Sequence, residues 1–218
     1  MRALTRRAKY LVAELSSGDL LVMHLGMSGW FRVEKNPDLE KHDHVVFEMS
    51  SGKTAVFNDP RRFGFMRIIP GSPSADWTAG ALGPEPLDRR FTPETLARAL
   101  HRKKTTLKAA LLDQRVVAGL GNIYVCEALH RARLSPRRKA STIVARSGAP
   151  TPKTDALVTA IKVTLRDAIA HQHRPSGADR FLVYDREGER CPRRGCGGAI
   201  ARIIQGGRST FYCPTCQR

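Results

Sequence analysis

Four cysteines close to the C-terminus have the spacing of a metal site. They lie in the stretch CPRRGCGGAIARIIQGGRSTFYCPTC, with four residues inside the first pair, two inside the second and sixteen between the pairs. Thiolates in two such pairs supply tetrahedral soft ligation, which suits zinc. A set of four leaves no position for water, so Cys191, Cys196, Cys213 and Cys216 predict one structural zinc ion. Four free thiols or a redox dithiol explain this spacing less well.

A basic residue lies between the two cysteine pairs, in the stretch QGGRS. Its two glycines indicate a hairpin turn and place Arg208 at the tip, away from any core. A guanidinium in that position can fork onto phosphate oxygens. An ordinary solvated turn arginine is the alternative, and the pattern alone does not separate the two.

Two stretches in the middle of the chain also have chemistry suited to phosphate. RKKTTLK, residues 102–108, includes Lys104 among four cations at a predicted helix start, and GLGNIY places Gly119, Gly121 and Asn122 in a tight turn before the next helix. Backbone N–H groups and the Asn122 amide would face outward there as an anion nest. A solvated helix face and a routine glycine linker are the alternatives.

Two short stretches in the first third combine cations with large apolar side chains. DPRRFG puts Arg61 and Phe63 after an Asp-Pro turn, and HLGMSG places Met27 between two glycines. A cation beside an exposed aromatic suits a wedge between bases with a phosphate anchor. Considered singly, a methionine or a phenylalanine such as Met27 or Phe63 is usually a core residue, and the alternative for His42 in EKHDHVV is a surface loop residue.

The charge of the whole chain favours a polyanionic partner. Lys and Arg number 37 against 20 Asp and Glu, which gives a net charge of +17. Such an excess suits nucleic acid, because neutralising phosphates releases counterions. We expect no membrane partner, since no basic amphipathic helix or long apolar run is present, and Glu14 and Asp19 interrupt a signal-peptide core. The expected location is the cytoplasm.

The elements that must position these residues change character along the chain. Short apolar runs from Tyr10 to Pro70, separated by turns such as SSGD and SSGK, predict an antiparallel sandwich or barrel. A Gly- and Pro-rich linker over residues 70–88 follows. Helices are then expected from Thr92, over Thr105–Gln114, over Ile123–Arg131 and over Thr154–Gln172, the last with an apolar stripe. The tail after Arg180 has short strands and turns.

Together these stretches resemble the bacterial formamidopyrimidine-DNA glycosylase family, which excises oxidised purines. The resemblance is carried, in family order from Arg6 to Gln217, by RRAKYL, HLGMSG, KHDH, DPRRFG, LGPEPL, KKTTLK, GLGNIY, YDREGE and QGGRSTFYC with its four cysteines. It implies a multidomain α+β protein with a partial antiparallel β-sandwich over 1–85, a helix–two-turn–helix domain over 86–180 and a four-cysteine zinc finger over 181–218. It also implies a monomer that binds damaged double-stranded DNA in the nucleoid and flips the damaged base.

The resemblance assigns roles to the residues singled out above. Met27, Arg61 and Phe63 resemble the residues that fill the gap left by the flipped base. His42, Lys104 and Asn122 resemble DNA contacts. Lys9 in RRAKY resembles the lysine assigned proton donation in strand cleavage, and Arg208 the finger-tip arginine assigned to the second elimination.

The chain departs from the family pattern in two places. The family begins with a proline nucleophile and a glutamate in a PELPEVE-type leader, and MRALTRRAKY does not match it. We therefore expect the chain to begin inside the first domain. The lid over the flipped base is also expected to be shortened, because HQHRPSGADRFLVYDREGE passes almost directly from helix to ribbon.

Two functions follow from this reading. The first is a base-excision-repair glycosylase and abasic-site lyase for 8-oxoguanine and formamidopyrimidines. The second is a damaged-DNA or abasic-site binding protein with impaired catalysis. Because the family leader is not matched, we expect very low base release from intact duplex, while DNA binding survives better. A basic zinc-ribbon transcription factor is a more distant alternative, since it gives Lys9 and the Arg61–Phe63 loop no purpose.

Overall fold

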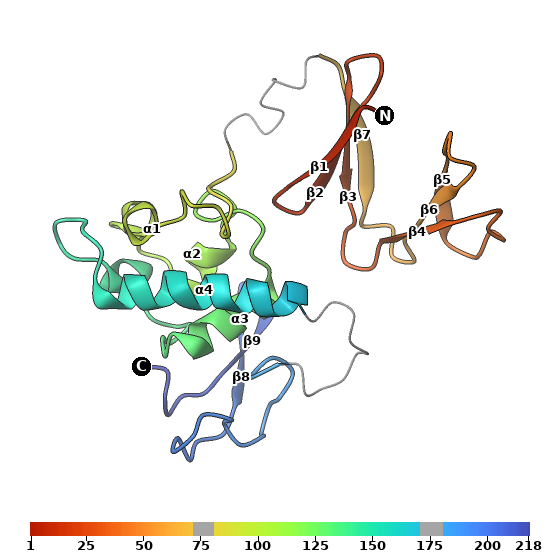
Figure 1. Ribbon diagram of the computed structural model, residues 1–218. Coiled ribbons are helices and arrows are strands. Elements are labelled where there is room, and N and C mark those ends of the chain that lie inside the picture. Colours follow the sequence, from red (N-terminus) through yellow and green to blue (C-terminus); the bar gives the residue numbers. More distant parts are fainter. Residues whose placement is uncertain (72–80, 171–180) are drawn as a thin grey trace. The chain divides into compact units, whose positions relative to one another are not determined.

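The computed structural model describes residues 1–71, 81–170 and 181–218. The chain forms two compact units, Met1–Ala79 and Gly80–Arg218 (Figure 1). Over its described residues 1–71 the first unit consists of strands and turns, and the second combines helices with a hairpin. The expected shortening of the lid lies mainly on residues 171–180, outside the described residues.

Two antiparallel sheets make up the first unit. One has the strand order β1-β2-β3-β7 and the other β4-β6-β5. Their bounds are β1 Ala3–Arg7, β2 Tyr10–Glu14, β3 Leu20–His24, β4 Trp30–Glu34, β5 Asp43–Glu48, β6 Thr54–Asn58 and β7 Phe65–Ile69. The chain crosses between the sheets twice, through residues 25–29 and 59–64, so both crossing loops carry residues that the sequence singled out.

Strand β1 is an element that the sequence analysis did not predict. It pairs with β2 in a register that sets Thr5 opposite Val12, yet four of its five residues are exposed. Apolar residues alternate clearly only where one face of a strand is buried. In β2 and β3, by contrast, Val12, Leu20 and Val22 form a small core with Tyr10 and Ile69 packed against it.

The helices of the second unit begin close to the predicted positions. They are α1 Pro93–Leu100, α2 Leu107–Leu112, α3 Asn122–Arg131, the 3-10 turn η1 Ala140–Ile143 and α4 Pro152–Ala170. Thr92 caps α1 as predicted, with Pro93 at the first helical position and the Thr95 hydroxyl completing a capping box. Thr106 caps α2, which is shorter than the predicted 105–114.

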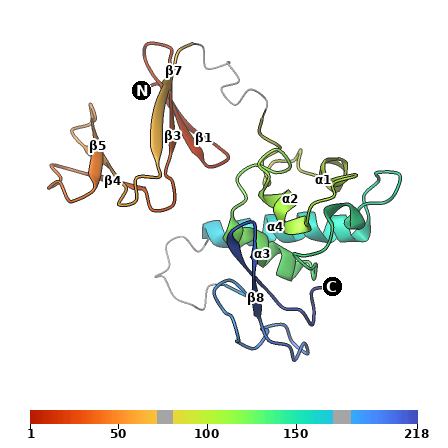
Figure 2. The same cartoon turned by 180° about the vertical axis from the view of Figure 1, so that it is seen from behind.

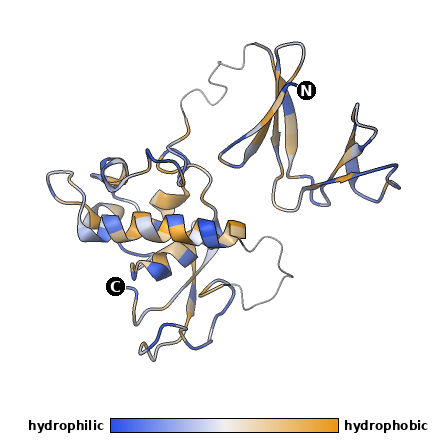
Figure 3. Ribbon diagram, viewed as in Figure 1, coloured by the Kyte–Doolittle hydropathy of each residue, from blue (hydrophilic) through white to orange (hydrophobic). Residues whose placement is uncertain are grey.

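The core of the second unit lies between α1, α2, α3 and α4. Its fully buried side chains include Phe91, Leu111, Leu129 and Leu157. Helix α4 alternates apolar and polar segments along its length (Figure 3). The predicted stripe is buried at Leu157, Val158 and Ile161 and only partly at Leu165, and Ile169 is 55% exposed. Among the described residues, none of the helices combines the length and the apolar character that crossing a membrane requires.

A hairpin of β8 (Ala201–Gln205) and β9 (Arg208–Tyr212) packs against α3 (Figures 1 and 2). Phe211 on β9 shares a buried cluster with Cys126 on α3, as well as with Val183 and Ile200. Cys126 is therefore a core residue. The finger and the helices belong to the same compact unit.

Candidate nucleic-acid interface

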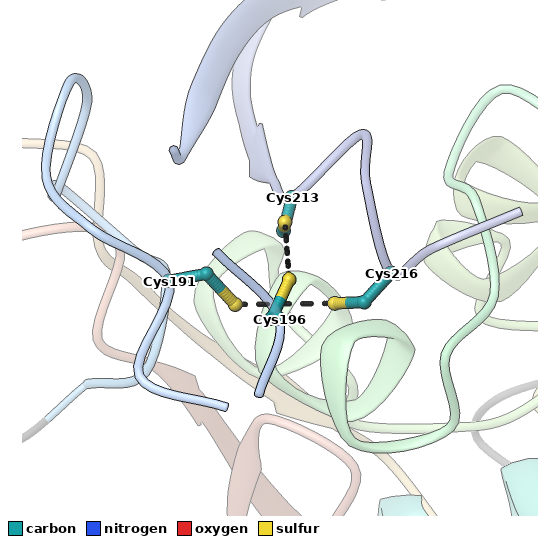
Figure 4. A group of neighbouring side chains, drawn as sticks. All are labelled: Cys191, Cys196, Cys213 and Cys216. Atoms are coloured by element: carbon teal, nitrogen blue, oxygen red, sulfur yellow. Dashed lines mark hydrogen bonds between the residues drawn. The ribbon is translucent and has the colours of Figure 1, made fainter. Parts of the chain in front are cut away.

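The four predicted zinc ligands come together in one cluster (Figure 4). Their sulfur atoms all lie within 4.8 Å of one another, with 3.9 Å between Cys191 and Cys216 and 3.5 Å between Cys196 and Cys213. Zn–S bonds of about 2.3 Å in a tetrahedron require sulfurs about 3.8 Å apart. The donor set and its spacing therefore fit a structural zinc ion, which holds the finger together.

The protein environment makes the four thiols unequal. Burial opposes ionisation of Cys213, but N–H groups of Cys216 and Thr215 and the thiol of Cys196 donate to its sulfur and bring its pKa down to about 7. Burial and the three neighbouring thiols raise the pKa of Cys216 to about 12. Because zinc binds thiolates, filling the site releases protons.

Side chains of α3 reach across to the segment that leads into the finger. The Glu127 carboxylate, 4% exposed, accepts N–H bonds from Leu182, Val183 and Tyr184 at 2.8 to 2.9 Å. One turn later the His130 ring contacts Cys191, with Nε2 3.4 Å from Sγ. Burial, and then three nearby arginines, lower the pKa of His130 to about 4. Neither residue was predicted from the sequence, although an acid inside the apolar run YVCEAL is a signal of a structural or functional role.

Arg208 is exposed at the end of the hairpin, as predicted. Gly206 and Gly207 have φ of 56° and 71°, so the two-residue turn uses the left-handed region that glycine adopts at little cost. Next to Arg208, the Ser209 carbonyl accepts bonds from Asn122 Nδ2 at 2.9 Å and Lys108 Nζ at 3.2 Å. These two side chains attach the backbone next to the hairpin turn to α3 and α2.

The cations of residues 102–108 do not form one solvated cluster. Lys108 is only 1% exposed and also donates to Thr210 Oγ1, while Lys103 pairs with Asp113 at 3.3 Å. Burial lowers the pKa of Lys108, the Cys126 thiol partly offsets this, and the charge of Arg208 lowers it further. Arg102 and Lys104 are exposed between α1 and α2. Of the four, Lys104 was the one proposed to contact DNA.

The turn before α3 is less open than an anion nest. The N–H of Gly119 donates to Gln114 Oε1 at 2.8 Å, and the Asn122 amide points to β9. Asn122 Oδ1 is buried without a partner among the described residues. The prediction that these groups face outward is therefore wrong for the Gly119 N–H and for Asn122 Nδ2, which bind within the protein.

In the first unit, Asp59 joins the two crossing loops. Its side chain is 1% exposed and accepts bonds from Ser28 Oγ at 2.8 Å, Gly64 N at 2.7 Å and Arg61 N at 3.3 Å. The Gly64 N–H contributes most to holding the pKa of Asp59 below its usual range, followed by the Ser28 hydroxyl, while burial opposes them. One carboxylate thus positions both the loop of Met27 and the loop of Phe63.

The same loops meet backbone to backbone at Gly26. A Cβ there would lie 2.5 Å from the nitrogen of Gly64, and the φ of Gly26 is +70°. Around this contact, Met27 is 73% and Phe63 55% exposed, and the Arg61 guanidinium lies 4.8 Å from the centre of the Phe63 ring. The two apolar side chains project from closely packed loop backbones and are not core residues.

His42 and His44 contact the backbone of Asp59. The His42 carbonyl accepts from Asp59 N at 3.0 Å, and His44 Nε2 lies 3.0 Å from the Asp59 carbonyl. The ring centres of the two histidines are 6.4 Å apart. The stretch KHDH therefore lies against the turn that begins DPRRFG.

Lys9 is exposed in the turn between β1 and β2. Burial, followed by the charge of Lys9, lowers the pKa of His24. His24 stacks on Phe65 at 5.7 Å, and its Nδ1 accepts from Gly26 N at 3.0 Å. His24 therefore packs on Phe65 and holds the Met27 loop through Gly26; its role and that of Asp59 were not predicted from the sequence.

Three family models match the chain. They describe the formamidopyrimidine-DNA glycosylase N-terminal domain over residues 1–66, the H2TH domain of formamidopyrimidine-DNA glycosylase over 82–178, and a zinc finger found in FPG and IleRS over 188–218. Among curated proteins, the formamidopyrimidine-DNA glycosylase of Bradyrhizobium sp. strain BTAi1 is 55% identical over 244 residues, covering 100% of this chain and 83% of the relative. That of Rhodopseudomonas palustris strain BisA53 is 54% identical, covering 99% and 82%.

Solved structures show the same similarity. Lactococcus lactis formamidopyrimidine-DNA glycosylase, non-covalently bound to DNA with an AP site, matches with a TM-score of 0.86 and 31% identity over 100% of this chain and 81% of that one. MutM in complex with DNA containing carbocyclic 8-oxo-G matches with a TM-score of 0.86, 31% identity, and 99% and 80% coverage. The MutM (Fpg) protein from Thermus thermophilus matches with 0.82, 37% identity, and 98% and 81% coverage.

Proposed function

Because the chain belongs to the formamidopyrimidine-DNA glycosylase family, we propose that it binds duplex DNA with an oxidised purine and releases the damaged base. 8-Oxoguanine and formamidopyrimidines are the proposed lesions, since solved relatives are described with DNA containing 8-oxo-G and Fapy-dG. The net charge of +17 supports a DNA partner. The zinc thiolates suit the reducing cytoplasm, which is the proposed location.

The observation that carries this proposal is the meeting of two crossing loops, residues 25–29 and 59–64, at Asp59. These loops present Met27 and Phe63 to solvent beside Arg61, and packing and hydrogen bonds hold the loop backbones in place. A base inside a duplex is reached only after it leaves the stack, and an apolar wedge can occupy the gap that it leaves. We assign this task to Met27 and Phe63, with Arg61 and His42 as DNA contacts.

The finger and the helices supply a second set of proposed contacts. Arg208 is exposed beside a carbonyl that Lys108 and Asn122 hold in place, so its guanidinium is presented on a braced turn. Lys104 is exposed on the connection between α1 and α2. We assign Arg208 and Lys104 to phosphates. The DNA contact predicted for Asn122 requires its side-chain amide to give up the hydrogen bond to the Ser209 carbonyl and to bind DNA instead.

We propose that the chain also cleaves the strand at the abasic site. Lys9 is the proposed proton donor for the first elimination and Arg208 for the second. A primary amine such as that of Lys9 can also add to the ring-opened sugar aldehyde, with loss of water, to give an imine. The exposed position of Lys9 in the turn between β1 and β2 supports this assignment.

Base release and binding are measured in the same reaction to test the function. Duplexes with 8-oxoguanine opposite cytosine are compared with undamaged duplexes, by anisotropy for binding and by mass detection for free base. The proposed function predicts tighter binding of the 8-oxoguanine duplex than of the undamaged duplex, together with release of free 8-oxoguanine. Tight lesion binding without release would favour the binding protein, and equal affinity for both duplexes would overturn the proposal.

A further inference from the structure

His130 is buried beside the zinc ligands and takes no part in the proposed DNA contacts. It lies in the last turn of α3 and is 2% exposed. Its Nε2 lies 3.4 Å from the sulfur of Cys191, which is 61 residues further along the chain. The ring therefore joins a metal ligand to a helix outside the finger.

The surroundings of the ring decide which nitrogen carries the proton. A thiolate only accepts hydrogen bonds, so a proton on Nε2 gives an N–H···S bond, whereas a bare Nε2 would set a lone pair against a negative sulfur. Nδ1 is buried without a partner among the described residues. An unpaired acceptor there is tolerated more readily than an unpaired N–H donor. The favoured arrangement therefore has a proton on Nε2.

A second contact keeps the ring in register with the sulfur. Arg193, inside the first cysteine pair, donates from Nη2 to the His130 carbonyl at 2.7 Å and to that of Arg131 at 3.4 Å. Carbonyls in the last turn of a helix lack partners within the helix, so an arginine is well placed there. The backbone and the side chain of His130 are thus both bound to the same cysteine loop.

We propose that His130 is a positioning residue of the zinc site, donating its Nε2 proton to the thiolate of Cys191. Four thiolates around one Zn²⁺ carry net negative charge, and a donor to one sulfur withdraws part of it. Outer-shell partners of this kind change metal affinity by about 10- to 100-fold. The bond also links filling of the finger to the position of α3, whose first residue, Asn122, contacts β9.

Two substitutions separate the donor from the bulk of the ring. His130→Phe keeps a planar ring and removes the donor, whereas the amide nitrogen of His130→Gln can reach the position of Nε2. We expect zinc transfer to an excess of chromogenic chelator to be about 10- to 100-fold faster in the Phe variant and close to the wild-type rate in the Gln variant. With Co²⁺ in place of zinc, the thiolate-to-metal charge-transfer band shifts to lower energy in the Phe variant only.

Arg193→Leu is the matched control, because it removes the backbone contact and leaves the ring on the sulfur. Its cobalt band stays at the wild-type energy even if zinc leaves faster. A folded Phe variant with wild-type zinc release and an unshifted band would overturn the proposal.

A measurement on the unmodified protein covers the case in which the Phe variant does not fold. With ¹¹³Cd in the site, the proton on His130 Nε2 should be seen by NMR and should show scalar coupling to the metal through the sulfur. A ring protonated on Nδ1, without that coupling, would overturn the assignment.

Discussion

The hydroxyl of Ser28 donates a hydrogen bond to Oδ1 of Asp59 at 2.8 Å, and this bond joins the loop that carries Met27 to the loop that carries Phe63. The same carboxylate accepts the N–H of Gly64 at 2.7 Å. Because both loops connect one sheet to the other, their relative position also fixes how the sheets of the first unit are joined. The buried Asp59 carboxylate therefore holds the two loops that carry the proposed wedge.

Asp59→Asn should disturb both loops at once. An amide has one acceptor oxygen where the carboxylate has two, and its NH₂ group would face either the Gly64 N–H or the Ser28 hydroxyl. We expect roughly tenfold weaker binding to a duplex with an abasic-site analogue, measured by anisotropy. Ser28→Ala removes one donor and leaves the carboxylate, so its effect should be smaller. Wild-type affinity and melting temperature in Asp59→Asn would refute the role of Asp59.

Phe63→Ala tests the wedge itself. Phe63 is 55% exposed, so its loss should leave the melting temperature unchanged. Stacking of an aromatic on a base is worth about 1–3 kcal/mol, so preference for the lesion should fall roughly tenfold or more. Fluorescence of 2-aminopurine next to the lesion rises when the bases unstack, and this rise should be smaller with the Phe63→Ala variant. Val33→Ala, at 55% exposure on β4, is the matched control, and an equal effect of the two changes would contradict the assignment.

Those parts of the structure that depend on neighbours in sequence could be predicted. The cysteine spacing predicted the four-sulfur cluster, and the Thr92-Pro93-Glu94 pattern predicted the start of α1. Both follow from chemistry within a few residues, since a cap or a metal-binding turn is a local structure. The exposed position of Arg208 followed from turn residues in the same way, whereas the sequence left Phe63 open between a wedge and a core residue.

The contacts that organise the candidate sites could not be predicted in this way. Asp59 contacts Ser28 across 31 residues, and Lys108 contacts Thr210 across 102. A lysine in KKTTLK has the sequence pattern of a solvated cation, and only the packing of β9 shows that it is buried. His130 likewise does not lie at a metal-ligand spacing from the four cysteines, because it contacts the sulfur of Cys191 and does not itself bind the metal.

Arg208→Ala should weaken DNA binding through loss of a phosphate contact. Each phosphate neutralised adds about one unit to the slope of log affinity against log salt. We therefore expect the slope to fall by about one unit, and Lys104→Ala to give the same change. Arg208→Lys keeps the charge and loses the fork, so it should restore the slope but not the full affinity. A slope unchanged from wild type would remove the tested residue from the phosphate contacts.

The second unit should lose stability in acid through Asp113. Its hydrogen bonds to Arg115, with a further contribution from Lys103, outweigh burial and lower its pKa to about 2. The unfolded value is about 3.9, so the contribution of Asp113 is complete above that pH and is lost as the pH falls through 2. Asp113→Asn should flatten the dependence of the melting temperature on pH in this range, and Lys103→Met should flatten it partly. The same slope in all three proteins would exclude Asp113 as its source.

Lys9→Ala tests the proposed strand-cleaving chemistry. If the Lys9 amine forms an imine with the sugar aldehyde, borohydride reduces the C=N bond and leaves a stable protein–DNA adduct, which denaturing gels resolve. We expect the wild-type chain to be trapped on an abasic-site duplex and the Ala variant to lose the adduct while keeping its affinity within a few-fold. His24→Phe is the control, because it replaces an imidazole in the same sheet and leaves the Lys9 amine, so this variant should still be trapped. Equal trapping of the wild type and Lys9→Ala would show that another amine is the nucleophile.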